Sequence, residues 1–352
     1  MPPRILTIHC SVPERTYVQR DVLRSFFAPI FRENPKVREI FENSQIEKRH
    51  AVLDLDFYSQ ERNVEERNHV YVEGALALGE QAIRACLEEI GAGPRDLDDF
   101  IVVSCTGYSN PGLEILLAKR LGLRENIRRT AIGGMGCYGA FPGLSRASES
   151  LAARPDSRVL LLMVEICSVT FQKSAATENV VASALFADGA AALILGNGRS
   201  PSRRGGPRFP KITDFETRTS YETTEDMGFF LTASGFRIQL SARVPVFIRQ
   251  NVAGLVDLLL SRNGLDRNDV GFWVIHPGGA KILDYVQEEL GLADEDLRFS
   301  RGVLSEYGNM SSPTVMFILN EIARRADPQP GDRGFMLGFG PGLTMEACLV
   351  QW

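Results

Sequence analysis

Three residues that can carry out acyl-transfer chemistry lie in glycine-rich segments far apart in the chain: Cys137, His276 and Asn309. Cys137 stands in the segment GGMGCYGAFPG, directly before a helix-like stretch from Leu144 to Ala153. The N–H groups and the dipole at a helix N-terminus lower the pKa of a thiol placed there. Glycines also allow a thioester carbonyl to approach the sulfur. The segment therefore predicts a nucleophilic cysteine, with a buried small apolar cysteine in a tight turn as the alternative.

His276 and Asn309 are of types that can stabilise negative charge on an oxygen. His276 follows the apolar run GFWVI and opens the segment HPGG, and Asn309 lies in YGNMSSP. Two N–H donors, one from each residue, could hold a developing oxyanion, and a histidine near the cysteine favours the thiolate. No acidic third member is evident, so the set need not be a protease triad. A structural histidine, and an asparagine in a left-handed turn after Gly308, are the alternatives.

The elements that position these residues alternate between short apolar runs and helical patterns. Strands are predicted at 4–9, 99–104, 158–165, 190–195, 271–275, 334–337 and 345–350, and helices at 20–31, 65–89, 113–121, 144–153, 246–262, 281–290 and 313–325. Such alternation favours mostly parallel sheets covered by helices. The segment 197–211 is rich in Gly, Pro, Ser and Arg and is the best linker candidate, so two halves of similar type are predicted.

Composition limits the function classes. The chain has 352 residues, above the roughly 250–300 at which one core stops growing, so two joined halves or one large two-part unit are expected. Its net charge of −5 argues against a nucleic-acid or membrane-surface binder. No stretch is judged long and apolar enough for a membrane span, and the start lacks the features of a signal peptide. Six cysteines without a Cys-x-x-Cys pair predict free thiols in a reducing cytoplasm and no zinc site.

Five segments, taken in order, carry a resemblance to a known family. They are GMGCYGAFPGL around Cys137, ALFADGAAALILG around Phe186, VIHPGGAKIL around His276, YGNMSSPTVMF around Asn309 and GFGPGLTMEA near the end. From about Gln45 onward the chain resembles the type III polyketide synthases, the chalcone and stilbene synthase family of the thiolase superfamily. The resemblance implies an α/β, thiolase-like fold (αβαβα) with mixed sheets layered between helices, in two similar halves at 1–200 and 212–352. The related ketoacyl-ACP synthase III enzymes are the runner-up.

The resemblance also implies roles for individual residues. Cys137 would take a starter acyl group from acyl-CoA, while His276 and Asn309 would promote decarboxylation of malonyl-CoA and stabilise the enolate that condenses with the Cys137 thioester. Phe186 matches the family's gatekeeper phenylalanine, and Ile238 stands where the family has a second one. The remaining expected cavity residues are Cys105, Thr106, Cys167, Val169, Thr170, Ser311 and Pro341, the last within the segment from Gly338 to Gly342 that would shape the cavity floor.

Binding partners follow from the same resemblance. Lys48 and Arg49 lie where the family uses basic residues to meet the CoA phosphates, with a solvated charged surface as the alternative. Gly278 and Gly279 would let the pantetheine arm pass close to the backbone. The family works as a homodimer without metal or prosthetic group, and Asn110 would fall near the loop that contacts the partner.

The product is less determined by the sequence than the reaction class. The resemblance implies that Cys167 and Ile238, which depart from the plant enzymes, fit bacterial relatives that accept a long-chain fatty acyl starter and release a pyrone or a resorcinol-type phenol. A synthase that uses malonyl-CoA alone, of the tetrahydroxynaphthalene type, is an alternative. Outside this family, a cysteine hydrolase and a non-catalytic acyl-binding protein are the two rival classes. The starter, the number of extensions and the ring closure depend on cavity volume, which the sequence does not show.

Overall fold

A nine-stranded sheet runs through the computed structural model, which describes residues 2–32, 34–198, 208–241 and 243–352. Its strands lie in the order β11-β12-β13-β8-β1-β7-β6-β4-β5. Their bounds are β1 (Arg4–Ser11), β4 (Asp99–Val103), β5 (Arg128–Ile132), β6 (Val159–Ile166), β7 (Asp188–Gly196), β8 (Lys211–Thr219), β11 (Phe272–Ile275), β12 (Arg333–Gly340) and β13 (Thr344–Gln351). Two short pairs lie apart from it: β2 (Thr16–Val18) with β3 (Lys48–His50), and β9 (Met227–Thr232) with β10 (Gly235–Leu240).

The large sheet consists of two parts of similar pattern. In the first part β4 is parallel to β5 and β6, whereas β7 is antiparallel to both β6 and β1. In the second part β11 and β12 are parallel, and β13 is antiparallel to β12 and β8. The two parts meet through one pair, Arg4 with Lys211. Both parts therefore mix parallel and antiparallel strands, as expected for this fold class.

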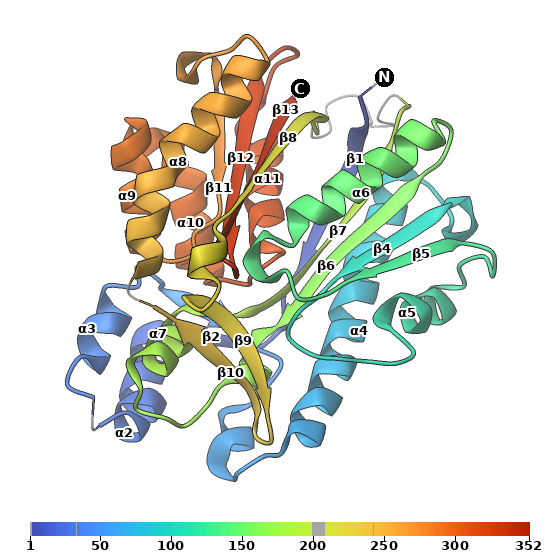
Figure 1. Ribbon diagram of the computed structural model, residues 1–352. Coiled ribbons are helices and arrows are strands. Elements are labelled where there is room, and N and C mark those ends of the chain that lie inside the picture. The colour runs from blue at the N-terminus through green and yellow to red at the C-terminus, as the bar shows by residue number, and fades with distance from the viewer. Residues whose placement is uncertain (1, 33, 199–207, 242) are drawn as a thin grey trace.

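Helices separate and cover the two parts of the sheet. The longer ones are α4 (Val64–Ile90), α5 (Leu113–Leu121), α6 (Ala140–Ala153), α7 (Thr177–Leu185), α8 (Arg243–Arg262), α9 (Ala280–Leu290), α10 (Arg298–Tyr307) and α11 (Thr314–Arg325), and α1 (Gln19–Val22), α2 (Ala28–Ile30) and α3 (Val37–Glu42) are short. Helices α4 and α5 cover the outer face of the first part, and α8 and α9 cover that of the second (Figure 1). Helices α6 and α11 lie between the two parts and complete five layers.

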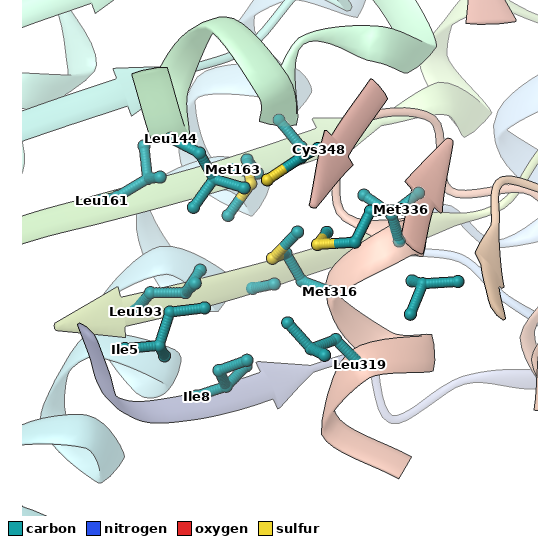
Figure 2. Packing of buried hydrophobic residues seen from close by; sticks show 14 of the residues in the cluster. Ile5, Ile8, Leu144, Leu161, Met163, Leu193, Met316, Leu319, Met336 and Cys348 are labelled. Atoms are coloured by element: carbon teal, nitrogen blue, oxygen red, sulfur yellow. The ribbon is translucent and has the colours of Figure 1, made fainter. Parts of the chain in front are cut away.

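The middle layer contains the largest buried cluster. Figure 2 shows Leu144 of α6 and Met316 and Leu319 of α11 directed toward side chains of both parts of the sheet. Strand β6 is buried along its whole length because both of its faces are covered. Leu161 and Met163 pack in the middle layer, and the alternate residues of the strand pack under α4.

Local sequence rules explain the element that organises the first half. Helix α4 begins with a capping box in which Asn63 accepts from the Glu66 N–H and Glu66 accepts from the Asn63 N–H. It ends at Gly91, whose φ of 63° is the left-handed conformation that favours glycine. Its apolar residues recur at helical spacing and face β6 and β7, so the predicted helix at 65–89 is confirmed with one added residue at each end.

Several sequence expectations differ from the structure. The helix expected at 20–31 is interrupted by a π-helical segment, Leu23–Phe27, between α1 and α2. The segment from Gly338 to Gly342 is not a loop throughout, because β12 continues to Gly340 and pairs Phe339 with Met345. The edge strand β5 and the hairpin β9–β10 were not expected. Most of the proposed linker lies outside the described residues, and the boundary between halves stays a prediction.

Helix α8 corrects the expectation that no segment is long and apolar enough for a membrane span. An 18-residue window within this 20-residue helix has a mean hydropathy of 1.3, so α8 meets that test by length and composition. Seven of its side chains are buried, and they belong to the core between α8, α9 and the second part of the sheet. Because a core helix can pass the same test, the composition of α8 is weak grounds for a membrane segment.

Candidate active site

Cys137 lies in a tight turn, Gly136–Tyr138, directly before α6. Gly136 has a φ of 66°, and a Cβ there would come within 2.7 Å of the Pro341 ring. Pro341 therefore packs against the loop of the nucleophile, which fixes the turn from the side of the second half. The Cys137 side chain is buried, with a relative exposure of 2%.

His276 follows β11, and its N–H continues the sheet by donating to the Leu337 carbonyl at 2.8 Å. The residue is completely buried, and neither ring nitrogen has a hydrogen-bond partner among the described residues. Burial lowers the pKa of His276 to about 3, so the imidazole is neutral at physiological pH. A buried histidine with two unpaired nitrogens that borders a cavity is poised to bond to a ligand.

Asn309 is held by its backbone against the end of α7. Its N–H donates to the Leu185 carbonyl at 2.8 Å, and its carbonyl accepts from the Ala187 N–H at 2.9 Å. These two hydrogen bonds lie on either side of Phe186. The side-chain Oδ1 accepts from the Ser311 N–H at 2.8 Å. Because Oδ1 is engaged in this way, the Asn309 NH2 group is the end of the amide that is left to donate.

The three residues line one cavity of about 670 Å³. Phe186, Ile238, Gly278 and Gly279 line the same cavity, as the sequence led us to expect. Other residues, which the sequence did not single out, also line this cavity. They include two aromatic side chains, two lysines and two glutamates: Phe229 of β9, Phe339 of β12, Lys36, Lys281, Glu39 and Glu178. Within the described ranges no three His, Cys, Asp or Glu side chains are grouped so as to hold a metal.

The other expected cavity residues are distributed around this cavity. Cys167 and Thr170 line a smaller pocket of about 70 Å³, and Phe186 and Ile238 line both pockets and so form their common wall. Thr106 and Val169 line a third pocket, of about 250 Å³.

Cys105 and Ser311 lie next to Cys137 but do not line the main cavity. The Cys105 sulfur is 4.0 Å from the Ser311 hydroxyl, and the Ser311 side chain also hydrogen-bonds Cys137. They belong to the immediate surroundings of the candidate nucleophile.

Lys48 and Arg49 are not brought to the cavity. The Lys48 ammonium pairs with Glu306 at 2.6 Å on the surface. The Arg49 side chain is buried, with 8% exposure, and its guanidinium donates to the carbonyls of Ser183 and Phe186 at 2.6 and 2.9 Å. For Arg49 the expectation of a contact with CoA phosphates is corrected, because its buried guanidinium is bonded to main-chain carbonyls. For exposed Lys48 the contact stays a prediction.

The expected lowering of the Cys137 pKa is also corrected. Burial raises the pKa of the thiol to about 11, although hydrogen bonds from Ser311 and Asn309 lower it, and the negative charge of Glu165 raises it further. In this arrangement the resting thiol is protonated and the imidazole of His276 is neutral. A neutral imidazole can accept the proton when the sulfur attacks a thioester.

Glu165 is a buried carboxylate that the sequence analysis missed. It is fully buried at the end of β6, and its Oε2 accepts from the N–H groups of Cys105 and Thr106 at 3.0 and 3.1 Å. Its Oε1 accepts from the Ser312 hydroxyl at 2.8 Å. Glu165 therefore joins a loop of the first half to the loop before α11. A single charged residue in an otherwise apolar strand, VLLLMVEI, is the feature that could have identified it.

Comparisons with known proteins cover both halves of the chain. Residues 2–199 match the N-terminal domain of chalcone and stilbene synthases, and residues 220–352 match their C-terminal domain. A 1,3,6,8-tetrahydroxynaphthalene synthase from Streptomyces peucetius subsp. caesius is 33% identical, over 99% of this chain and 93% of its own length. A 3,5-dihydroxyphenylacetyl-CoA synthase from Streptomyces toyocaensis is 33% identical, over 99% and 90% of the two chains.

Solved structures show the same fold. The crystal structure of 1,3,6,8-tetrahydroxynaphthalene synthase from Streptomyces coelicolor A3(2), a bacterial type III polyketide synthase, superposes with a TM-score of 0.91 at 27% identity over 99% of both chains. The type III domain of Steely1 from Dictyostelium gives 0.92 at 29% identity, over 100% of this chain and 99% of that domain. The expected thiolase-like α/β fold is confirmed.

Proposed function

This chain belongs to the chalcone and stilbene synthase family and is a type III polyketide synthase, and on that premise we propose that Cys137, His276 and Asn309 carry out its chemistry. The Cys137 sulfur attacks the carbonyl carbon of a CoA thioester while His276 accepts the thiol proton. The bond to the CoA sulfur then breaks, and CoA leaves as the thiol with the proton from His276, which is neutral again. The observation that carries the proposal is that all three line one cavity in which the ring nitrogens of His276 have no partner among the described residues.

The condensation step uses the same residues. The neutral imidazole and the Asn309 NH2 group donate to the thioester oxygen of malonyl-CoA, so that loss of CO2 leaves an enolate whose oxygen is stabilised. The enolate carbon attacks the carbonyl of the Cys137 thioester, the C–S bond breaks, and the elongated chain remains on CoA for return to the cysteine. The largely apolar walls of the cavity, which include Phe186 and Phe229, exclude water and disfavour the carboxylate.

We propose that the substrates are CoA thioesters, that no further cofactor takes part, and that Lys36 and Lys281 meet the CoA phosphates. Both lysines are exposed and line the cavity. A Cβ on Gly278 or Gly279 would meet no atom closer than 3.5 Å, so packing does not demand glycine there. The space that the two glycines leave open is suited to the pantetheine arm.

Charge-reversing substitution of Lys36 and Lys281 tests the phosphate contact. We expect Lys281→Glu and Lys36→Glu each to raise the KM for malonyl-CoA by roughly two- to fivefold, since exposed ion pairs contribute little. The KM for malonyl-N-acetylcysteamine, which lacks the phosphates, should not change. Lys119→Glu on α5 is the control. An equal rise with both thioesters would remove the lysines from this role.

For the starter we propose malonyl-CoA itself. The names of two relatives describe ring products without a long alkyl chain, 1,3,6,8-tetrahydroxynaphthalene and 3,5-dihydroxyphenylacetyl-CoA. Phe229 supports this choice, because its ring lies 6.4 Å from that of Phe186 and occupies space at the cavity wall. A fatty acyl starter is the second candidate. It is favoured by the size of the cavity and by Ile238 in its wall, which is smaller than the phenylalanine that the family has at this position.

Product analysis with labelled malonyl-CoA, alone and with acyl-CoA starters of graded length, distinguishes these candidates. We expect a phenolic product from malonyl-CoA alone. Phe229→Ala should enlarge the cavity and improve the use of longer starters, by up to about fourfold in kcat/KM for each methylene newly accommodated. Phe230→Ala is the matched control, because the neighbouring ring is exposed and stacks on Arg237. Wild-type turnover only with long acyl-CoA would overturn the choice of malonyl-CoA.

We also propose a homodimer located in the cytoplasm. All six cysteines are free in the described parts of the chain, which suits a reducing compartment. Strand β5 ends the large sheet, its outer edge has no partner strand in the described chain, and most of its residues are exposed. A second copy that covers this edge, near the loop of Asn110, is consistent with the resemblance, and sedimentation in solution would reveal a monomer if the proposal is wrong.

A further inference from the structure

Arg49 is a buried cation that the proposed chemistry does not use. It lies in β3, and its guanidinium carbon is 5.6 Å from the centre of the Phe27 ring. Burial lowers the pKa of Arg49 only to about 10, so it is charged at physiological pH. Tyr58 and Asp188 act in the opposite direction to burial and raise the Arg49 pKa. A buried charge is costly to keep in a protein unless its contacts compensate for the lost hydration.

The contacts of Arg49 concentrate on the junction between α7 and Phe186. Its Nη1 donates to the Ser183 carbonyl, within the last turn of α7, and to the carbonyl of Phe186, one residue past the helix. Carbonyls at a helix C-terminus lack partners within the helix, and a cation there interacts favourably with the dipole. The guanidinium thus fixes the main chain at the residue expected to act as gatekeeper.

The same side chain also touches the segment that carries Asn309. A Cβ on Gly308 would lie 3.0 Å from the Arg49 Cγ and 3.0 Å from the Leu185 carbonyl oxygen, and Gly308 has a φ of 73°. Gly308 is therefore the residue type that permits Arg49, Leu185 and the chain before Asn309 to meet. The Asn309 main chain in turn bonds to Leu185 and Ala187, on either side of Phe186.

We propose that Arg49 is a positioning residue for decarboxylation: it holds the main chain of Phe186 and Asn309 together from behind the cavity. This inference rests on the proposed roles of Asn309 and Cys137. The loop of Cys137 is supported from other elements, by Pro341 against Gly136 and by Val103 of β4 against Gly139. Loss of Arg49 therefore displaces the amide donor while leaving the nucleophile in place.

The test separates the two half-reactions in Arg49→Met. Single-turnover mass spectrometry follows acylation of Cys137, and release of labelled CO2 follows decarboxylation of malonyl-CoA. We expect decarboxylation kcat to fall roughly 10- to 100-fold, as for displaced catalytic groups, with the KM for malonyl-CoA within twofold and acylation within about threefold of wild type. Arg49→Lys, which keeps a cation and donors, should recover part of the loss.

Arg267→Met is the matched control, because the Arg267 guanidinium donates to the Glu289 and Leu290 carbonyls at the far end of α9. It should lower the melting temperature without separating the half-reactions. A parallel fall of acylation and decarboxylation in both Arg49 variants would overturn the inference, as would a KM increase that disappears with malonyl-N-acetylcysteamine. If the wild-type chain itself neither acylates nor decarboxylates, the proposed function fails instead.

Discussion

Cys137→Ala is expected to abolish polyketide formation, with a loss of at least about 10³-fold, because no other group can hold the growing chain as a thioester during condensation. Incubation of the wild-type chain with acyl-CoA should add the mass of the acyl group to the peptide that contains Cys137, and the variant should show no such gain. Decarboxylation of malonyl-CoA should persist in the variant, since His276 and Asn309 are unchanged.

Cys10→Ala is the control for this experiment, because Cys10 lies in β1, outside the cavity. It should acylate and form product at the wild-type rate. The outcome also separates the rival classes. A cysteine hydrolase would release free acid from acyl-CoA without consuming malonyl-CoA. A non-catalytic acyl-binding protein would show no acyl adduct, and its Cys137→Ala variant would bind acyl-CoA as tightly as the wild-type chain. A full yield of product from Cys137→Ala would refute the proposed nucleophile.

The second large effect concerns the two donors to the enolate. We expect His276→Ala and Asn309→Ala each to slow malonyl-CoA decarboxylation by roughly 10²–10³-fold, the loss typical of a missing oxyanion donor. Acylation of Cys137 should be less affected by Asn309→Ala than decarboxylation is. His276→Gln, which keeps a donor at similar reach, should retain more activity than His276→Ala. His69→Ala and Asn320→Ala, on α4 and α11, are controls for the two residue types.

The pH dependence follows from the lowered pKa of His276. Because the folded-state pKa is about 3, the imidazole stays neutral from pH 8 down to pH 5, and it is protonated only in strong acid. Decarboxylation rates should therefore be flat between pH 6 and 8. A fall in rate as the pH rises through 6 to 7 would mean that the imidazolium is the required form, and near-normal rates in both alanine variants would remove the residues from this step.

The amino-acid pattern was sufficient for the reaction class and for most regular elements. Helix α4 follows from its capping box and the helical recurrence of apolar residues, and β6 from an apolar run too short for a helix. The segments around Cys137, Phe186, His276 and Asn309 and the closing GFGPGLTMEA were enough to predict the family and the fold, because in this order they resemble the chalcone and stilbene synthases. These features are local, so they can be read from the chain without its contacts.

Features that depend on contacts between distant residues required the tertiary structure. Arg49 resembles a surface cation in its sequence setting, yet the carbonyls that it binds lie 134 and 137 residues away. Glu165 and Phe229 became recognisable only when the loops around Ser312 and Phe186 were placed beside them. The pKa of Cys137 likewise follows from burial rather than from the neighbouring helix. The periodicity of apolar residues and the residue types in turns depend only on neighbouring residues, so they can be read from the sequence. Burial, the pKa values of buried groups and the shape of the cavity arise only when the two halves pack together.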